Sequence, residues 1–247
     1  MARKIFIGIG VLFSIFILLF VLSQNQPPPL LTTNFVNLDK IERISRFRSC
    51  AGHVTVPQNN REQRRNMKHY FWIKKSITTN DKPVEIYAPY NGFVSVLRSD
   101  SNEGLEGEIA LVPKDVFVFL PPIGRWTFSV QHINVRQDLK RGKEVKAGEL
   151  LGTATIRGEG GGSFDIVYAK FAPTLKKIDN WTDPFIDLDS VFNHMSDSVF
   201  AQYQKKGVAT KDDIVMLKEQ RDQNLCQYQN GGPYFENQED PDNWVIF

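Results

Sequence analysis

Short runs of β-branched and aromatic residues, separated by turn residues, constrain the fold of this chain more than any other feature. Between residues 84 and 170 these runs are interrupted by Gly142, Gly148 and Gly152, and they are too short for helices. In the turn Ala-Pro-Tyr-Asn-Gly at residues 88–92, proline fixes one backbone angle and glycine can adopt a positive φ. The region therefore predicts strands that fold back through tight turns.

The order of these signals resembles the lysostaphin-type zinc metallopeptidases (peptidase family M23) and their inactive relatives. The matching residues are Ala88-Pro89-x-x-Gly92-x-Val94, His132, Gly142-x-x-Val145-x-x-Gly148-x-x-x-Gly152 and Ser163-Phe164-Asp165-Ile166. The resemblance covers about a third of the chain and implies a small β-sandwich or barrel, called a duplicated hybrid motif. Because one fold hosts many functions, the function has to be argued from the site residues.

Biotinyl and lipoyl carrier domains share the first and third of these elements and fold similarly. Carrier domains present one lysine at a hairpin tip, usually between two methionines. Lys146 lies between Val145 and Ala147, so it matches the strand–turn element and not an attachment tip. The carrier interpretation is therefore the weaker of the two.

The resemblance also implies where a zinc site would lie. The peptidases hold zinc with an early His-x-x-x-Asp and the second His of a late His-x-His, and a further His helps in catalysis. Here the late motif is Ser163-Phe164-Asp165, so Asp165 stands at the ligand position, and only His132 matches a catalytic position. Neither His53 nor His69 is followed by an aspartate four residues later.

A catalytic zinc ion needs about three protein ligands and an open position for water, which this set does not supply. In the simpler interpretation, Asp165 is a solvent-facing strand residue and His132 a hydrogen-bonded strand histidine. We therefore predict no cofactor and a role in binding or scaffolding at the cell envelope, as relatives without the ligands often have. The alternative is a divergent metal-dependent hydrolase, a peptidase of the cell envelope, that uses His132, Asp165 and either His53 or His69, with zinc as the possible metal.

An apolar, uncharged run extends from Ile5 to Leu22. Its length of about 18 residues is close to what a helix needs to cross a bilayer core. Arg3 and Lys4 precede it, and positive residues stay on the cytoplasmic side. The run predicts a single-pass anchor in the cell membrane, with the following domain outside the cytoplasm. A cleaved signal peptide, the competing interpretation, would have a shorter apolar core and an Ala-x-Ala-like site.

Four parts are predicted along the chain, and the fold class is mainly β. Residues 1–24 form the anchor, and residues 25–45 form an extended spacer with three consecutive prolines. Residues 46–175 form the β-rich domain. Residues 176–247 form a helical extension and a docked tail.

Two helices are predicted in this extension. Asp183-Pro184 is a helix-start signal for a first helix, which ends at Gly207. Thr210-x-x-Asp213 resembles a capping box for a second helix that reaches about residue 224.

The chain has two cysteines, Cys50 and Cys226. Outside the cytoplasm an isolated pair is a disulfide candidate, and the alternative is two free buried thiols. Asn180 begins an Asn-Trp-Thr sequence, which is a candidate for glycosylation.

Charge is distributed unevenly along the chain. The formal net charge of +2 argues against a dedicated nucleic-acid binder. Residues 35–80 contain 10 Lys and Arg against 3 Asp and Glu, whereas residues from Asp179 onward contain 5 against 13. These segments form solvated faces or attract each other across the fold. A third interpretation is that the basic segment holds an anionic polymer or headgroup.

Overall fold

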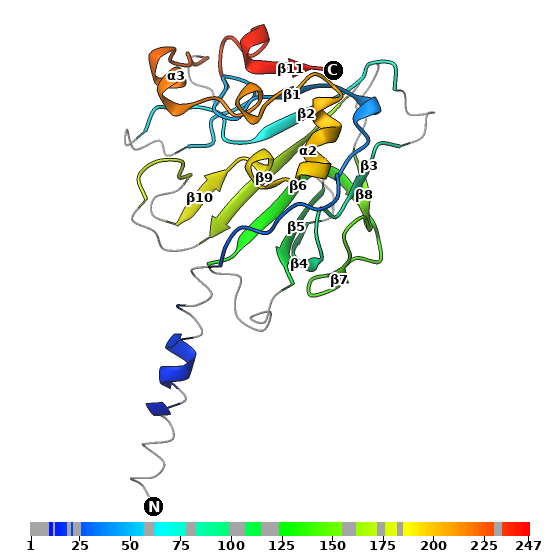
Figure 1. The fold of residues 1–247 in the computed structure, drawn as a ribbon, viewed down its shortest axis with the longest axis vertical. Helices are drawn as coiled ribbons and strands as arrows, with labels where there is room; N and C mark the ends of the chain where they lie inside the picture. The colour runs from blue at the N-terminus through cyan, green and yellow to red at the C-terminus, as the bar shows by residue number, and fades with distance from the viewer. Residues whose placement is uncertain are drawn as a thin grey trace, which may run out of the picture.

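The computed structural model describes residues 26–56, 62–77, 83–98, 107–114, 124–154, 162–171, 176–181, 185–229 and 234–247, together with residues 10–11, 13–18 and 21. These segments form a mainly β fold with a few short helices, which confirms the predicted class (Figure 1).

All strands of the described residues join one sheet, and every strand pair in it is antiparallel. The strands are β1 (Ile41–Ser45), β2 (His69–Ile73), β3 (Glu85–Tyr87), β4 (Gly92–Arg98), β5 (Gly107–Pro113), β6 (Trp126–Val135), β7 (Glu144–Val145), β8 (Leu150–Ala154), β9 (Ser163–Phe171), β10 (Ile186–Asp189) and β11 (Trp244–Ile246). They pair in the order β11-β1-β2-β9-β6-β5-β4-β7; β10 pairs with β9, and β8 joins β3 to β6.

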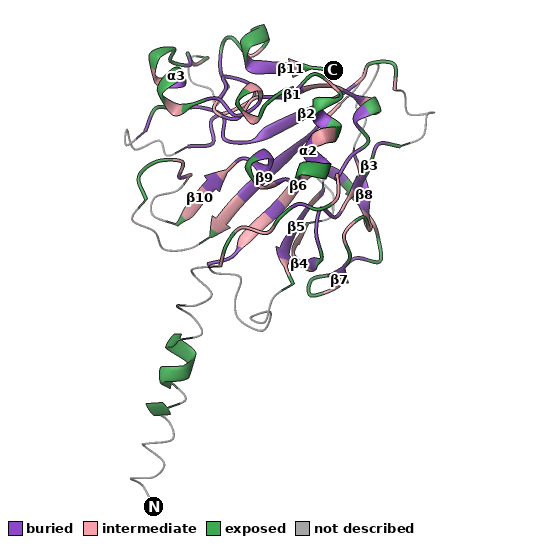
Figure 2. Cartoon of the chain, viewed as in Figure 1, coloured by how far each residue is buried: buried purple, intermediate pink, exposed green. Residues whose placement is uncertain are grey.

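The hydrophobic core lies on one face of this sheet. Phe71 of β2 and Phe164 of β9 point to that face, and their rings stack with centroids 5.0 Å apart. Phe35 packs on Phe71 and on Phe128 of β6, at centroid distances of 5.3 and 5.2 Å. Buried residues are concentrated along β2, β5 and β9 in Figure 2. Helix α2 (Asp197–Gln204) lies in front of β6 in Figure 1.

Strand β6 changes partner part-way along its length. Residues 126–131 pair with β9, whereas residues 133–135 pair with β8. His132 lies at the change, has a φ of 66°, and is skipped in the pairing with β5. It is the extra residue of a β-bulge, which bends a strand and increases its twist. The bulge lets β6 pair with β9 before His132 and with β8 after it.

The glycine turns lie where the sequence predicts them. Gly142 and Gly148 both have a φ of 80°, a left-handed conformation that favours glycine. The turn at residues 88–92 separates β3 from β4, but these two strands do not pair with each other. Instead β3 pairs with β8, and β4 pairs with β5 and β7.

Residues 31–45 belong to the domain, which corrects the prediction of a spacer over residues 25–45. Leu31, Phe35 and Ile41 are fully buried, and β1 occupies the end of this segment. The Leu31 N–H donates to the carbonyl of His194 at 2.8 Å. The segment covers the core face of the sheet, and burial of its apolar side chains outweighs the extended tendency of the preceding prolines.

The prediction of a first C-terminal helix, from Asp183-Pro184 to Gly207, is wrong for its first half. Its start signal, Asp183-Pro184, lies outside the described residues, and β10 pairs with β9 just beyond it. The 3-10 helix η2 (Val191–His194) and helix α2 follow, capped by the Ser190 and Ser196 side chains. Pairing with a neighbouring strand satisfies the backbone of residues 186–189, and this non-local contact overrides the local helix-start signal.

The second predicted helix is also shorter than expected. The Thr210 N–H donates to Asp213 Oδ2 at 2.7 Å, as a capping box requires. The box opens only the 3-10 helix η3 (Lys211–Asp213), and helix α3 spans Lys218–Gln223.

Part of the predicted anchor from Ile5 to Leu22 is described. Residues 10–11, 13–18 and 21 are helical and exposed. Within the described residues, no helix combines the length and apolar character needed to cross a membrane. The rest of the run lies outside the described residues, and the anchor stays a prediction.

Segments near the two ends of the domain are joined to each other. Cys50 and Cys226 form a disulfide with their Cα atoms 5.4 Å apart, which confirms the predicted bond. Strand β11 pairs with β1. Among the described residues, ion pairs connect the basic segment to the acidic one: Arg43–Glu239, Arg48–Asp179, Arg65–Asp222 and Asp39–Lys206. The two charged segments therefore attract each other across the fold.

Candidate functional site

A group of polar side chains lies on the sheet face opposite the core, and we call it the sheet-face cluster. Its members are His53, Lys68, Tyr70, Gln131, His132 and Asp165. Tyr70 of β2 pairs with Asp165 of β9, and Asp165 pairs with Gln131 of β6. Directly paired residues point to the same face of a sheet, so these three side chains lie in a row.

Lys68 and Asp165 form a buried ion pair within the cluster. The two residues are 4% and 1% exposed. Lys68 Nζ donates to Asp165 Oδ2 at 3.4 Å and to Gln131 Oε1 at 2.7 Å. Asp165 Oδ1 is a buried oxygen without a hydrogen-bond partner in the described part of the chain. A buried charge is costly unless it is paired, so Lys68 is the counter-ion of Asp165. Asp165 is thus not the solvent-facing residue of the simpler interpretation.

His132 reaches the same carboxylate from the bulge of β6. Its Nε2 lies 3.5 Å from Asp165 Oδ2, and 38% of its side chain is exposed. A left-handed backbone is uncommon for a residue other than glycine, and such conformations gather at functional sites. The bulge therefore directs an accessible imidazole toward a buried acid.

His53 lies at the edge of the cluster, in a loop. Its ring meets the rings of Tyr70 and Tyr234 edge-on, at centroid distances of 6.0 and 6.1 Å. Its main-chain N–H donates to Tyr70 Oη at 3.3 Å. Burial, and after it the charge of Lys68, lower the pKa of His53 below its usual value. His53 is therefore a neutral imidazole at pH 7.

His69, the other candidate metal ligand, points away from the cluster and into the core. Its Nδ1 lies 2.8 Å from the Ser45 carbonyl and its Nε2 lies 2.7 Å from Ser190 Oγ. The ring packs against Phe47 and Phe192. Burial lowers the pKa of His69 to about 4. This histidine is a structural residue, which corrects its place among the candidate ligands.

Acidification is expected to destabilise the protein through His69. Its pKa is about 4 in the folded state, against about 6.5 in an unfolded chain. The unfolded state takes up the proton first. The stability due to the neutral ring is therefore complete above about pH 6.5 and falls by on the order of 3 kcal/mol toward pH 4. Urea unfolding of the wild type and of His69→Gln between pH 7 and pH 4 measures this. The stability difference between the two should shrink as the pH falls, and a constant difference would contradict the assignment.

The cluster does not fit the zinc ion that the sequence resemblance implies. Asp165 and His132 could each supply one ligand. Within the described residues, however, no group of three or more His, Cys, Asp or Glu could hold a metal ion. The Lys68 ammonium also binds the oxygens of Asp165 and Gln131 that would have to face a metal, and its charge repels a divalent cation.

Sequence reasoning missed Lys68, Tyr70 and Gln131. A signal for the first two was available, because Lys68 and Tyr70 alternate with His69 and Phe71 in a strand-like run and so share one face. The sequence gives no indication that this face meets Asp165.

Asn180, the candidate glycosylation residue, is fully buried. In the folded chain its side-chain nitrogen therefore does not lie at the surface, where a glycan would be attached.

No protein-family model and no curated protein matches the chain. Solved structures similar to part of it include lysostaphin, a zinc containing peptidase from Vibrio cholerae and Csd3 from Helicobacter pylori. Their identities are 17%, 14% and 16% over 51%, 50% and 76% of this chain, with TM-scores of 0.32, 0.29 and 0.35. The matches span 48%, 36% and 45% of those chains, less than half of each.

Proposed function

We propose that this chain is a membrane-anchored binding domain of the cell envelope, with a lysostaphin-type fold and without zinc-dependent catalysis. The observation that carries the proposal is the buried ion pair of Lys68 and Asp165. Hydrolysis by zinc requires a metal position open to water and a base within hydrogen-bond reach. In this chain the carboxylate at the ligand position, Asp165, forms an ion pair with Lys68.

The accessible part of the same sheet face is the proposed binding surface. Ser129 and Gln131 of β6 and Ser163 of β9 are partly exposed, and the His132 imidazole is accessible beside them. Hydroxyl, amide and imidazole groups suit a ligand that carries both donors and acceptors along its length. Such ligands include the peptide and glycan chains of the cell envelope.

The run from Ile5 to Leu22 is proposed to hold this domain at the outer side of the membrane. Arg3 and Lys4 favour a cytoplasmic position for the residues before the run. The large apolar side chains of its described part, from Val11 to Val21, are exposed, which suits a lipid environment.

The full chain, extracted from membranes in detergent, tests the proposal. We expect it to remain in membranes through an alkaline wash and to contain zinc far below one equivalent, with no change in metal content in Asp165→Ala. We expect it to sediment with insoluble peptidoglycan without releasing soluble fragments. His132→Ala should weaken this binding, whereas Asn134→Ala, at an exposed position of the same strand, should not.

One observation favours the alternative of a divergent hydrolase, namely the 3.5 Å contact between His132 Nε2 and Asp165 Oδ2. One equivalent of zinc that disappears in Asp165→Ala, or release of peptidoglycan fragments, would establish this alternative and exclude the binding domain.

A further inference from the structure

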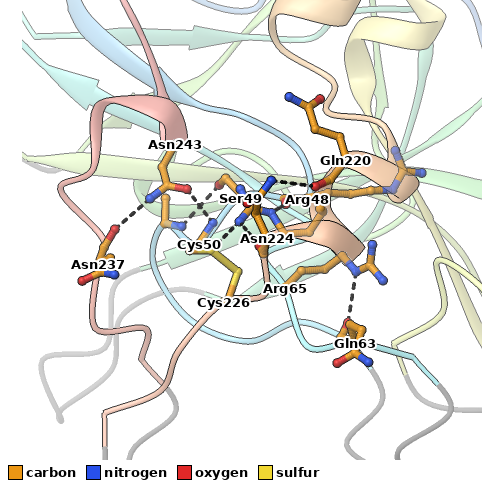
Figure 3. The surroundings of a disulfide bond; sticks show 12 residues. Arg48, Ser49, Cys50, Gln63, Arg65, Gln220, Asn224, Cys226, Asn237 and Asn243 are labelled. Carbon is orange, nitrogen blue, oxygen red and sulfur yellow. Dashed lines mark hydrogen bonds between the residues drawn. A yellow bond between two sulfur atoms is a disulfide. The ribbon is translucent and has the colours of Figure 1, made fainter.

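The disulfide lines a polar cavity at the edge of the core. Cys50 and Cys226 are 7% and 9% exposed, and both border a cavity of about 390 Å³. Figure 3 shows Asn243 and Asn237 beside the bond; Asn243 Oδ1 accepts a hydrogen bond from the Cys50 N–H at 2.9 Å. The cavity gives a small thiol a route to the two sulfur atoms.

Arg221 donates a hydrogen bond to one of these sulfurs, Cys50 Sγ. Its Nη1 donates to Cys50 Sγ at 2.9 Å and to the Asn224 carbonyl at 2.7 Å. Its Nε donates to the Arg48 carbonyl at 2.8 Å. The two carbonyl contacts hold the guanidinium in place independently of the sulfur, and the residue is only 7% exposed.

The positive charge of Arg221 has no contacting counter-ion. The ion pairs formed by the described residues include none to Arg221. Burial and, after it, the charge of Arg65 lower the pKa of Arg221, whereas the charges of Asp240 and Asp242 oppose this shift. Arg46, Asp240 and Asp242 line the same cavity. A buried cation is stabilised by an anion beside it. A thiolate formed at Cys50 would be such an anion for the Arg221 guanidinium.

We propose that the Cys50–Cys226 bond is a thiol-exchange site, at which an external thiolate attacks Cys226 Sγ and Cys50 leaves as a thiolate next to Arg221. The attack forms a mixed disulfide between the reagent and Cys226, and the electron pair of the broken bond stays on Cys50. With a dithiol reagent, the second thiolate displaces Cys226, which takes a proton from solvent. The reagent ends as a disulfide, and the protein is reduced by two electrons.

Two chemical facts select Cys50 as the leaving group. A thiol of lower pKa leaves faster in disulfide exchange. A neighbouring guanidinium lowers the pKa of a thiol, and the hydrogen bond of Arg221 goes to Cys50 Sγ. The reagent is therefore a low-molecular-weight thiol or a dithiol of an oxidoreductase.

Thiol exchange at this bond would also affect His53, which lies at the edge of the sheet-face cluster. His53 closely follows Cys50 and forms a β-bridge with Tyr234, which closely follows Cys226. Opening the bond removes the covalent link between the segment that carries His53 and the segment that carries Tyr234, whose ring meets the His53 imidazole.

The folded full chain in detergent provides the test. After brief exposure to glutathione and an acid quench, mass spectrometry should find the mixed disulfide on Cys226. Reduction by dithiothreitol should be about three- to tenfold slower in Arg221→Met. Arg46→Met, which removes a charge from the same cavity without touching sulfur, should change the rate less than twofold, and Arg221→Lys should fall between the wild type and Arg221→Met.

Several results would overturn the proposal. One is a glutathione adduct mainly on Cys50, or equally on both sulfurs. Another is reduction that occurs only when the chain is unfolded by urea. A folded Arg221→Met variant that is reduced at the wild-type rate or faster is a third. Should Arg221→Met fail to fold, the adduct position in the wild type decides the question alone.

Discussion

Replacing Lys68 by methionine should lower the free energy of unfolding by about 3–5 kcal/mol, because Asp165 then stays buried without a cation. Because methionine keeps most of the side-chain volume, the loss of stability comes from removal of the charge and not from a cavity. Urea unfolding at pH 7 measures the change. Lys75→Met, at an exposed position just after β2, is the matched control and should stay within about 0.5 kcal/mol of the wild type.

A double variant separates the cost of the lone charge from the value of the pair. Lys68→Met combined with Asp165→Leu removes both charges, and replacing a buried pair by apolar residues is often neutral or stabilising. We expect it to recover most of the loss. A cost below about 1 kcal/mol for Lys68→Met alone would mean that solvent screens the pair. The main support for the proposed function would then be gone.

Loss of the disulfide should have the other large effect. The bond joins residues with a sequence separation of 176, and the chain-entropy model gives a stabilisation of about 5 kcal/mol for a loop of that length. The Cys50→Ser/Cys226→Ser double variant and the reduced wild type should unfold at similarly lower urea concentrations. Reductant should not affect the double variant, which serves as the control. A reduced wild type with an unchanged midpoint would show that the crosslink does not constrain the unfolded chain.

The sequence predicted the parts of the fold that depend on local signals. Glycines at turns, such as Gly142 and Gly148, can adopt a left-handed backbone that other residues rarely adopt, so their positive φ could be anticipated. The disulfide followed from the presence of only two cysteines and the expected compartment. His132 and Asp165 were both singled out as candidates, and the structure brings them together.

The errors come from contacts between distant parts of the chain. The alternation around Lys68 indicated which residues share a face, but pairing of β2 with β9 decides that this lysine meets Asp165. Residues 186–189 follow the helix-start signal Asp183-Pro184, yet they form a strand that pairs with β9. Phe35 lies just beyond a proline-rich stretch, and its burial depends on a core built by later strands.

The pairing of β11 with β1 affects the order in which this protein can be completed during synthesis. Strand β1 lies between β2 and β11, and β11 follows all the other strands in the chain. Until it is made, β1 keeps an open edge, and unpaired strand edges are where partly folded chains associate with one another. A chain cut before Trp244 would therefore lack the strand that pairs with β1. The edge of the sheet would then be the five-residue β1 in place of the three-residue β11, and short edge strands limit association between sheets.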